Sequence, residues 1–387
     1  MFTPRKSHLM SPVQEDLPRI SDLAARQTID STAAYKEFLR VREQLEAYEG
    51  SMHWKKTGAY EYLVHKKHGR STPLGPRSAE TEERLAQFNE RKHKLQVRFK
   101  SLKEAVETSQ RMNKAVRAGS VPSPVVDVLS ALDESGLGRE ALVVGAPALY
   151  AYTQSSGLQA DVVLMHHAES GWIHGEEVPF VVLVEMKSAS PAAVEKLRHS
   201  IKGVDITSEP LPTAQKVALV VNYTPHKTAL APHTEEYRHT TESAWVFPCA
   251  AERESSNLHK WANHVFLKVL DETPKFEQVV IGKTGRMAMM RTVDPMLFVA
   301  FSEKASEVAA ERHPGDACRN RLQAELVSKM VQEYWIASKL DEAELHQVSS
   351  KLNDYWTLVQ DSSSPCLAPA PKRLSKSAPK PSTKQAH

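Results

Sequence analysis

The sequence predicts an α/β (α+β) protein in which a small core of alternating strands and helices lies between two helical regions. Short apolar runs of strand length alternate with helical patterns from about residue 121 to residue 290. On both sides of this core, apolar residues recur at three- and four-residue steps, which is typical of amphipathic helices. The chain has 387 residues, 41% of them hydrophobic, so it is long enough to bury a large core.

Composition excludes several classes of protein. The formal net charge of +3 is not the strong basic excess of a general nucleic-acid binder. The three cysteines, Cys249, Cys318 and Cys366, are far apart and form no C-x-x-C pair, so neither a structural zinc nor a disulfide framework is expected. The sequence has neither a secretory signal pattern nor an apolar run of about 18 residues. We therefore expect a cytoplasmic protein with no membrane partner.

The N-terminal third is expected to hold an arm and a helical region. Residues 1–30 are polar and contain three prolines, which predicts a disordered arm. Residues 31–120 are predicted to be mainly helical, and the first helix is expected from Thr32 to Glu49. After a break at Gly50 and Ser51, the piece from Tyr60 to Val64 has strand composition.

A loop and a second helix are expected to complete this region. Pro73, Gly75 and Pro76 predict a loop over residues 70–77. Ser78 is a suitable capping residue for a long charged helix that runs to about Ala118.

The same patterns of apolar residues predict the strands and helices of the core and of the C-terminal part. Expected strands are 141–144, 161–165, 180–186, 216–221, 245–247 and 278–281, and expected helices are 125–134, 148–154, 191–201 and 258–270. Residues 291–360 are predicted to form C-terminal helices, at 295–312, 319–339 and 341–359. Residues 361–387 are rich in Pro, Ser and Lys, which predicts a disordered basic tail.

The run VVLVEMKS, residues 181–188, places Glu185 and Lys187 two apart on an apolar strand. Alternate residues of a strand share a face, so these two side chains are expected to lie together. With Asp161 on the preceding strand, the pattern resembles metal-dependent PD-(D/E)xK nucleases. That resemblance implies Asp161 and Glu185 as Mg²⁺ ligands and Lys187 as the catalytic cation. The alternative is a strand that ends in solvated charges.

A second resemblance covers more of the chain, from about residue 50 to residue 335. The segments GSMHWKK, LVVGAPALYAY and FEQVVIGKTGRMAMMRTVDPMLF occur in the order seen in a bacterial nucleotidyltransferase-like family. This family has a helical N-terminal arm before a small mixed-sheet nucleotidyltransferase core. The resemblance implies an enzyme that transfers a nucleoside monophosphate from an NTP, with Mg²⁺ or Mn²⁺ as cofactor.

The resemblance also implies a nucleotide-binding turn at Gly145 and Ala146. In the family a glycine followed by Ser or Thr holds the triphosphate through backbone N–H groups and a hydroxyl. Here Ala146 stands at the hydroxyl position and Pro147 follows it. The turn is therefore expected without its side-chain donor.

The metal-binding carboxylates are largely missing from the expected positions. The family needs two acids at alternate positions of one strand and a third on a neighbouring strand. If the first strand is 179–185, the two acid positions hold Pro179 and Val181, and only Glu185 remains as a later acid. If it is 160–165, Asp161 is kept but Val163 replaces its partner. The stretch around residues 244–247, where the third acid is expected, holds none.

Two surfaces are candidates for a protein or nucleic-acid partner. Basic residues near the N-terminus stand beside aromatic ones, a mixture that can contact phosphates and bases. They are Lys55, Lys56, Lys66, Lys67, His68 and Arg70, beside Trp54, Tyr60 and Tyr62. The alternative is that the aromatics pack the arm onto the core and the lysines are solvated. The tail adds Lys372, Arg373, Lys376, Lys380 and Lys384.

The sequence therefore leaves three functions open. The first is a degenerate nucleotidyltransferase with a binding or regulatory role, or with weak transfer to an unknown acceptor. The second is a metal-dependent nuclease that uses Asp161, Glu185 and Lys187. The third is an interaction module built on the arm and the tail.

Overall fold

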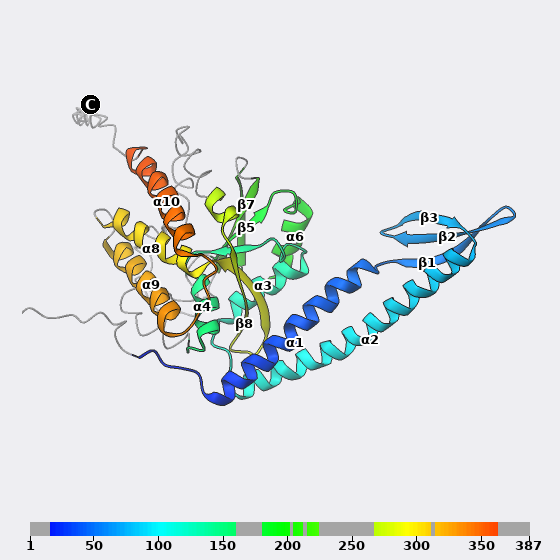
Figure 1. The fold of residues 1–387 in the computed structure, drawn as a ribbon, viewed down its shortest axis with the longest axis horizontal. Coiled ribbons are helices and arrows are strands. Elements are labelled where there is room, and N and C mark those ends of the chain that lie inside the picture. Colours follow the sequence, from blue (N-terminus) through cyan, green and yellow to red (C-terminus); the bar gives the residue numbers. More distant parts are fainter. Residues whose placement is uncertain are drawn as a thin grey trace, which may run out of the picture.

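A computed structural model describes residues 16–159, 180–201, 204–211, 215–223, 267–310 and 314–362. Within these ranges the molecule has two parts (Figure 1). A long arm of two helices projects from one side, and a mixed sheet with its helices forms the core.

The arm consists of two helices joined by a small sheet. Its elements are α1 (Asp22–Ala47), β1 (Ser51–Thr57), β2 (Tyr60–Lys67), β3 (Arg70–Pro76) and α2 (Ala79–Ala115). The helix α2 has 37 residues and begins with a capping box, in which Ser78 and Thr81 satisfy each other's backbone N–H groups. At about 1.5 Å per residue, α2 is roughly 55 Å long. This length places the small sheet far from the core (Figure 1).

Two expectations for this region are wrong. First, α1 begins at Asp22 rather than Thr32, and Leu17 is buried, with its amide donating to the Tyr334 hydroxyl at 2.9 Å. Part of the expected disordered arm is thus ordered against the C-terminal helices. Second, residues 70–76 form the edge strand β3 instead of a loop. Proline is tolerated there because an edge strand leaves one row of N–H positions unpaired.

The core is a six-stranded mixed sheet, as the fold-class prediction requires. Its strand order is β6–β7–β5–β4–β9–β8. The strands are β4 (Leu142–Val144), β5 (Phe180–Glu185), β6 (Val204–Leu211), β7 (Lys216–Tyr223), β8 (Lys275–Ile281) and β9 (Met287–Val293). Only β4 and β9 pair in parallel, and the other neighbours are antiparallel. Strands β6 and β9 lack typical strand composition, since β6 contains Pro210 and β9 is rich in methionine.

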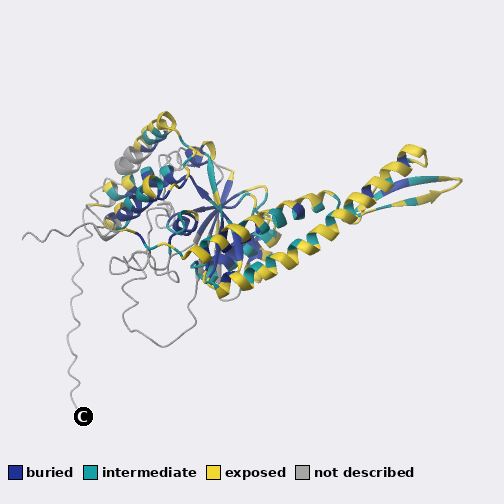
Figure 2. Cartoon of the chain, turned by 60° about the horizontal axis from the view of Figure 1, so that its bottom comes forward, coloured by how far each residue is buried: buried dark blue, intermediate teal, exposed yellow. Residues whose placement is uncertain are grey.

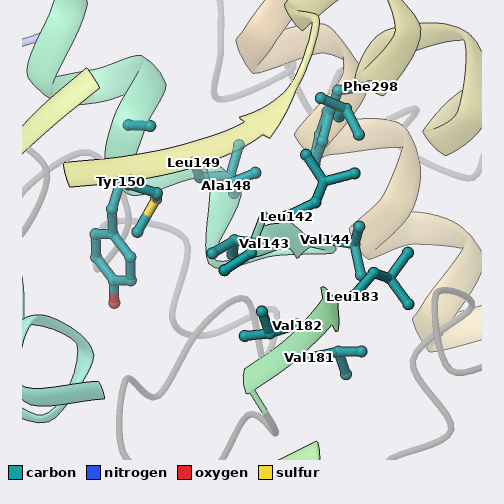
Figure 3. Packing of buried hydrophobic residues seen from close by; sticks show 14 of the residues in the cluster. Leu142, Val143, Val144, Ala148, Leu149, Tyr150, Val181, Val182, Leu183 and Phe298 are labelled. Atoms are coloured by element: carbon teal, nitrogen blue, oxygen red, sulfur yellow. The ribbon is translucent and has the colours of Figure 1, made fainter. Parts of the chain in front are cut away.

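The helices of the core agree with the predicted ones. They are α3 (Ser123–Glu134), α4 (Ala148–Ser156), α6 (Pro191–Ser200), α8 (Pro295–Ala309), α9 (Pro314–Glu333) and α10 (Glu342–Ser362). Residues Val143, Leu149, Val182 and Phe298 are fully buried and belong to one hydrophobic cluster, part of which Figure 3 shows. Across the described ranges, no helix is both long and apolar enough to cross a bilayer.

The arm is joined to the core by buried polar contacts. Asn113 of α2 is fully buried, accepts a hydrogen bond from Gln27 of α1 at 3.0 Å and donates to the Gly285 carbonyl at 3.2 Å. Gly285 lies in the β8–β9 turn with a φ of +82°, and a Cβ there would lie 2.1 Å from the Gln110 carbonyl oxygen. The joint therefore depends on a close approach that only glycine allows.

Candidate functional site

The expected nucleotide-binding turn lies between β4 and α4. Gly145 follows the last residue of β4 and has a φ of +81°, a conformation that favours glycine. Pro147 is the N-cap of α4 and Ala148 is its first residue. The strand-to-helix turn opening a mixed sheet is thus present, with Gly145 at its centre. Ala146 is partly buried and packs against the hydrophobic core.

Apolar residues surround this turn. Val144 of β4 pairs with Val181 of β5, so both residues lie at the end of the sheet where Gly145 is found, here called the Gly145 edge. Val181 is one of the positions where a catalytic acid was expected, and its side chain is only 4% exposed. The described part of this edge therefore offers hydrocarbon where a metal ligand is needed.

Glu185 lies at the other end of the sheet. From Val181 to Glu185, β5 rises about 13 Å, since a strand advances roughly 3.3 Å per residue. Glu185 pairs in register with Lys216 of β7, and its carboxylate accepts a hydrogen bond from the Lys216 Nζ at 2.7 Å. This end of the sheet, here called the Glu185 edge, is therefore separate from the Gly145 turn.

A three-membered ion cluster forms at the Glu185 edge. The Lys216 Nζ also lies 2.8 Å from the Asp271 carboxylate, and the lysine side chain is 8% exposed. Burial alone would lower the pKa of Lys216, but the hydrogen bonds that it donates to the Asp271 and Glu185 carboxylates outweigh burial, and the pKa is raised. Glu185 is thus the partner of a lysine whose charged form is favoured.

Lys187 does not share a strand face with Glu185, contrary to expectation. Strand β5 ends at Glu185 and Lys187 lies in the turn after it. Its side chain is 76% exposed and its Nζ is 4.0 Å from Glu140, whose carboxylate also accepts a hydrogen bond from Ser188. Two members of the predicted nuclease triad therefore point to different partners.

The third member, Asp161, lies outside the described residues, as do Val163 and the 244–247 segment. Within the described ranges, no three His, Cys, Asp or Glu side chains gather in a way that could hold a metal ion. The residues that the structure places at the Gly145 edge thus do not fit a magnesium pair.

One lysine at the Gly145 edge escaped the sequence interpretation. Lys275 begins β8 and pairs with Val293, one residue beyond Thr292, which bridges to Val143 of β4. Burial lowers the pKa of Lys275 to about 8, and its Nζ donates to the Thr273 carbonyl at 2.8 Å. No sequence pattern near Lys275 indicates that it is buried, because its burial depends on how distant segments of the chain pack against the sheet.

Lys216 and Asp271 were also missed by sequence reasoning. They are 55 residues apart and meet only because the helix at residues 267–272 lies beside the start of β7. The only local signal is a charged residue that begins the apolar run KVALVV. To pair Lys216 with Glu185, the register between β5 and β7 has to be known, and the sequence alone does not predict that register.

Comparisons with known proteins support the resemblance drawn from the sequence. A family model described as Nucleotidyltransferase matches residues 123–349, more than half of the chain. No curated protein and no solved structure matches. The match covers the mixed sheet, the Gly145 turn and most of the C-terminal helices, and the chain belongs to this nucleotidyltransferase family.

Proposed function

We propose that this member of the nucleotidyltransferase family is catalytically degenerate and uses the fold to bind a nucleotide in a binding or regulatory role. The observation that carries the proposal is the residue type at two positions of the Gly145 edge. Ala146 replaces the hydroxyl donor, and the buried Val181 occupies one acid position. A valine cannot coordinate Mg²⁺, which requires oxygen ligands in near-octahedral geometry.

Nucleotide binding would depend on the backbone of the turn. The amides of Ala148, Leu149 and Tyr150 already donate to the carbonyls of Gly145, Ala146 and Pro147 at 3.0, 3.0 and 3.2 Å. A phosphate would therefore be held by the amides of Gly145 and Ala146, at the turn that precedes the N-terminus of α4. With few donors and no hydroxyl, we expect weak affinity.

Thermal melting with each NTP, alone and with Mg²⁺ or Mn²⁺, tests the proposal. A ligand that binds only the folded state raises the melting temperature. At a ligand concentration one hundred times the Kd, the folded state gains about 2.7 kcal/mol of stability. We expect a shift with one or more NTPs that is lost in Ala146→Asp, because a carboxylate repels phosphate. Lys187→Ala is the matched control, since its exposed side chain lies beyond the opposite edge of the sheet.

Two activities would overturn the degenerate assignment. Metal-dependent transfer of a nucleoside monophosphate that disappears in Asp161→Asn would show that Asp161 acts as a catalytic carboxylate. Metal-dependent cleavage of DNA or RNA that disappears in Glu185→Ala would support the nuclease alternative. Nothing in the described geometry favours the nuclease, because Glu185 is paired with Lys216 and Lys187 is in a turn.

A further inference from the structure

The three strands β1–β3 lie at the far end of the arm, so they cannot pack the arm onto the core (Figure 1). This rules out the alternative in which Trp54, Tyr60 and Tyr62 attach the arm to the sheet of the core. The hairpin between β1 and β2 is the outermost part, and Figure 2 shows it as exposed. A function for these aromatic residues has to be found at the tip itself.

One face of the small sheet is bound to α2. His65 contacts the Phe88 ring at 5.6 Å between centroids, and the Arg77 guanidinium lies 5.3 Å from the centre of the Trp54 ring. These side chains alternate with those of the opposite face, as strand geometry requires. Phe88 of α2 and Arg77, which precedes that helix, therefore contact the face that carries Trp54 and His65.

The opposite face, here called the tip face, carries His53, Lys55, Tyr60, Tyr62 and Lys66. The register sets Lys55 directly opposite Tyr62, and Tyr60 and Lys66 follow on the same face of β2. Tyr60 is 67% exposed, an unusual exposure for a large aromatic ring. Val64 on the same face is buried and Tyr62 is partly exposed, so the exposed basic and aromatic side chains of the tip face lie around a small buried centre.

The tip carries a strong local positive charge although the whole chain is nearly neutral. Between Ser51 and Pro76 there are five lysines and arginines and one acid, Glu61. Glu61 is paired with Arg77 at 2.6 Å, and Lys67 lies 3.4 Å from Glu49. The other four basic residues are exposed, and the described residues provide no acid partner for them; they are Lys55, Lys56, Lys66 and Arg70.

We propose that the tip face binds single-stranded nucleic acid. Lysine ammonium groups would neutralise phosphates, and the tyrosine rings would stack on unpaired bases. Unpaired strands are favoured over duplexes because stacking on Tyr60 and Tyr62 requires bases whose faces are free. The inference goes beyond the proposed nucleotide pocket and does not depend on it, since the tip lies at the end of an arm roughly 55 Å long.

Fluorescence anisotropy with short labelled strands tests the proposal on the full chain. The probes are single-stranded RNA, single-stranded DNA and a DNA duplex, titrated over a range of salt concentrations. We expect binding to one or both single strands. The double variant K55A/K66A should bind more weakly and reduce the salt slope by about 1.4, because each phosphate contact contributes roughly 0.7 on single strands.

Tyrosine variants separate stacking from charge. Tyr60→Ala is expected to weaken binding about tenfold, in the range measured for base stacking, whereas Tyr60→Phe should retain it. The matched control is K100A/K103A, which removes two exposed lysines of α2 roughly 30 Å from its start. This variant has the same charge change and should bind as the unmodified protein does.

Four outcomes would overturn the proposal. The first is equal weakening by K55A/K66A and K100A/K103A, which would indicate attraction to the arm as a whole. The second is binding to the duplex alone, and the third is no binding to any strand. The fourth is capture by anionic lipid vesicles without binding to strands, which would assign the tip face to a membrane surface. Loss of nucleotide binding in the Gly145 turn would leave the result at the tip unchanged.

Discussion

The two sheets of this molecule use similar strands for opposite purposes. Strand β5 is interior to the core sheet and reads FVVLVE, and its described residues from Val181 to Val184 are all buried. Strand β2 is the centre of the tip sheet and reads YEYLVHKK, with Leu63 and Val64 as its only buried residues. The core strand is thus buried throughout this run, whereas the tip strand is buried only in the middle and carries exposed or half-buried side chains on either side. The comparison indicates that the first sheet stabilises the fold, and it agrees with the proposal that the second contacts a partner.

The largest expected difference compares an aromatic residue from each region. Phe298 is fully buried, with its ring centroid 5.5 Å from that of Tyr152, so Phe298→Ala should cost about 4 kcal/mol of unfolding free energy. Tyr60→Ala removes a largely exposed ring and should cost less than about 0.5 kcal/mol. Urea denaturation followed by circular dichroism measures both. Similar losses would mean that the tip supports the fold.

The second comparison uses two glycines with positive φ. Gly285→Ala would bring a Cβ within 2.1 Å of the Gln110 carbonyl oxygen, so we expect a loss of about 3 kcal/mol. Gly58→Ala, in the β1–β2 hairpin with φ +63°, meets nothing within 4 Å and should lose about 1 kcal/mol from backbone strain alone. Hydrogen exchange in α2 should increase near Asn113 for the first variant only. Equal exchange in the two variants would contradict the inference that the joint between arm and core depends on the close approach of Gly285 to Gln110.

The third comparison uses two lysines. Lys216→Met leaves Glu185 and Asp271 without their shared cation, and we expect a loss of about 2 kcal/mol, limited because both carboxylates reach solvent. Lys55→Met at the tip should change stability by less than about 0.5 kcal/mol. The same denaturation experiment separates them. Unchanged stability of the Lys216 variant would show that the ion cluster does not stabilise the core.

The last comparison is a pH dependence that belongs to the core alone. The pKa of Lys275 falls from 10.5 to about 8 through burial, so between these pH values the unfolded chain binds more protons than the folded one. The burial penalty on the charged lysine is therefore complete below pH 8 and is relieved as pH rises towards 10.5. Relative to Lys275→Met, melting temperatures should rise over this window. A constant difference between the two proteins would refute the assignment.

Much of the fold follows from local sequence patterns. The apolar runs of β4 and β5, the Gly145 turn and the helix beginning at Ala148 were all expected, because each depends on residues that are neighbours in the chain. Strand β3 was not expected, since Pro73 and Gly75 usually mark a loop. It forms because β2 offers a partner and an edge position tolerates proline.

In the candidate site, too, some features follow from the local sequence and others only from the tertiary structure. Residue identity alone shows that Ala146 carries no hydroxyl and Val181 no carboxylate, because a side chain's ligand chemistry does not depend on the fold. That the family needs a hydroxyl and an acid at these two positions stays a prediction from the resemblance. The separation of Glu185 from Gly145 depends on strand direction and register, which shorter patterns do not encode. The partners of Lys216 and the burial of Lys275 likewise come from segments far apart in sequence.

The sequence by itself determined the fold class and the family, since these depend on periodicity and on the order of motifs. The tertiary structure decided which charges are paired, and it placed the basic and aromatic residues of the arm at its far end instead of against the core. The physical reason is that pairing and exposure depend on distances between elements, and those distances are fixed only when the helices and sheets pack together.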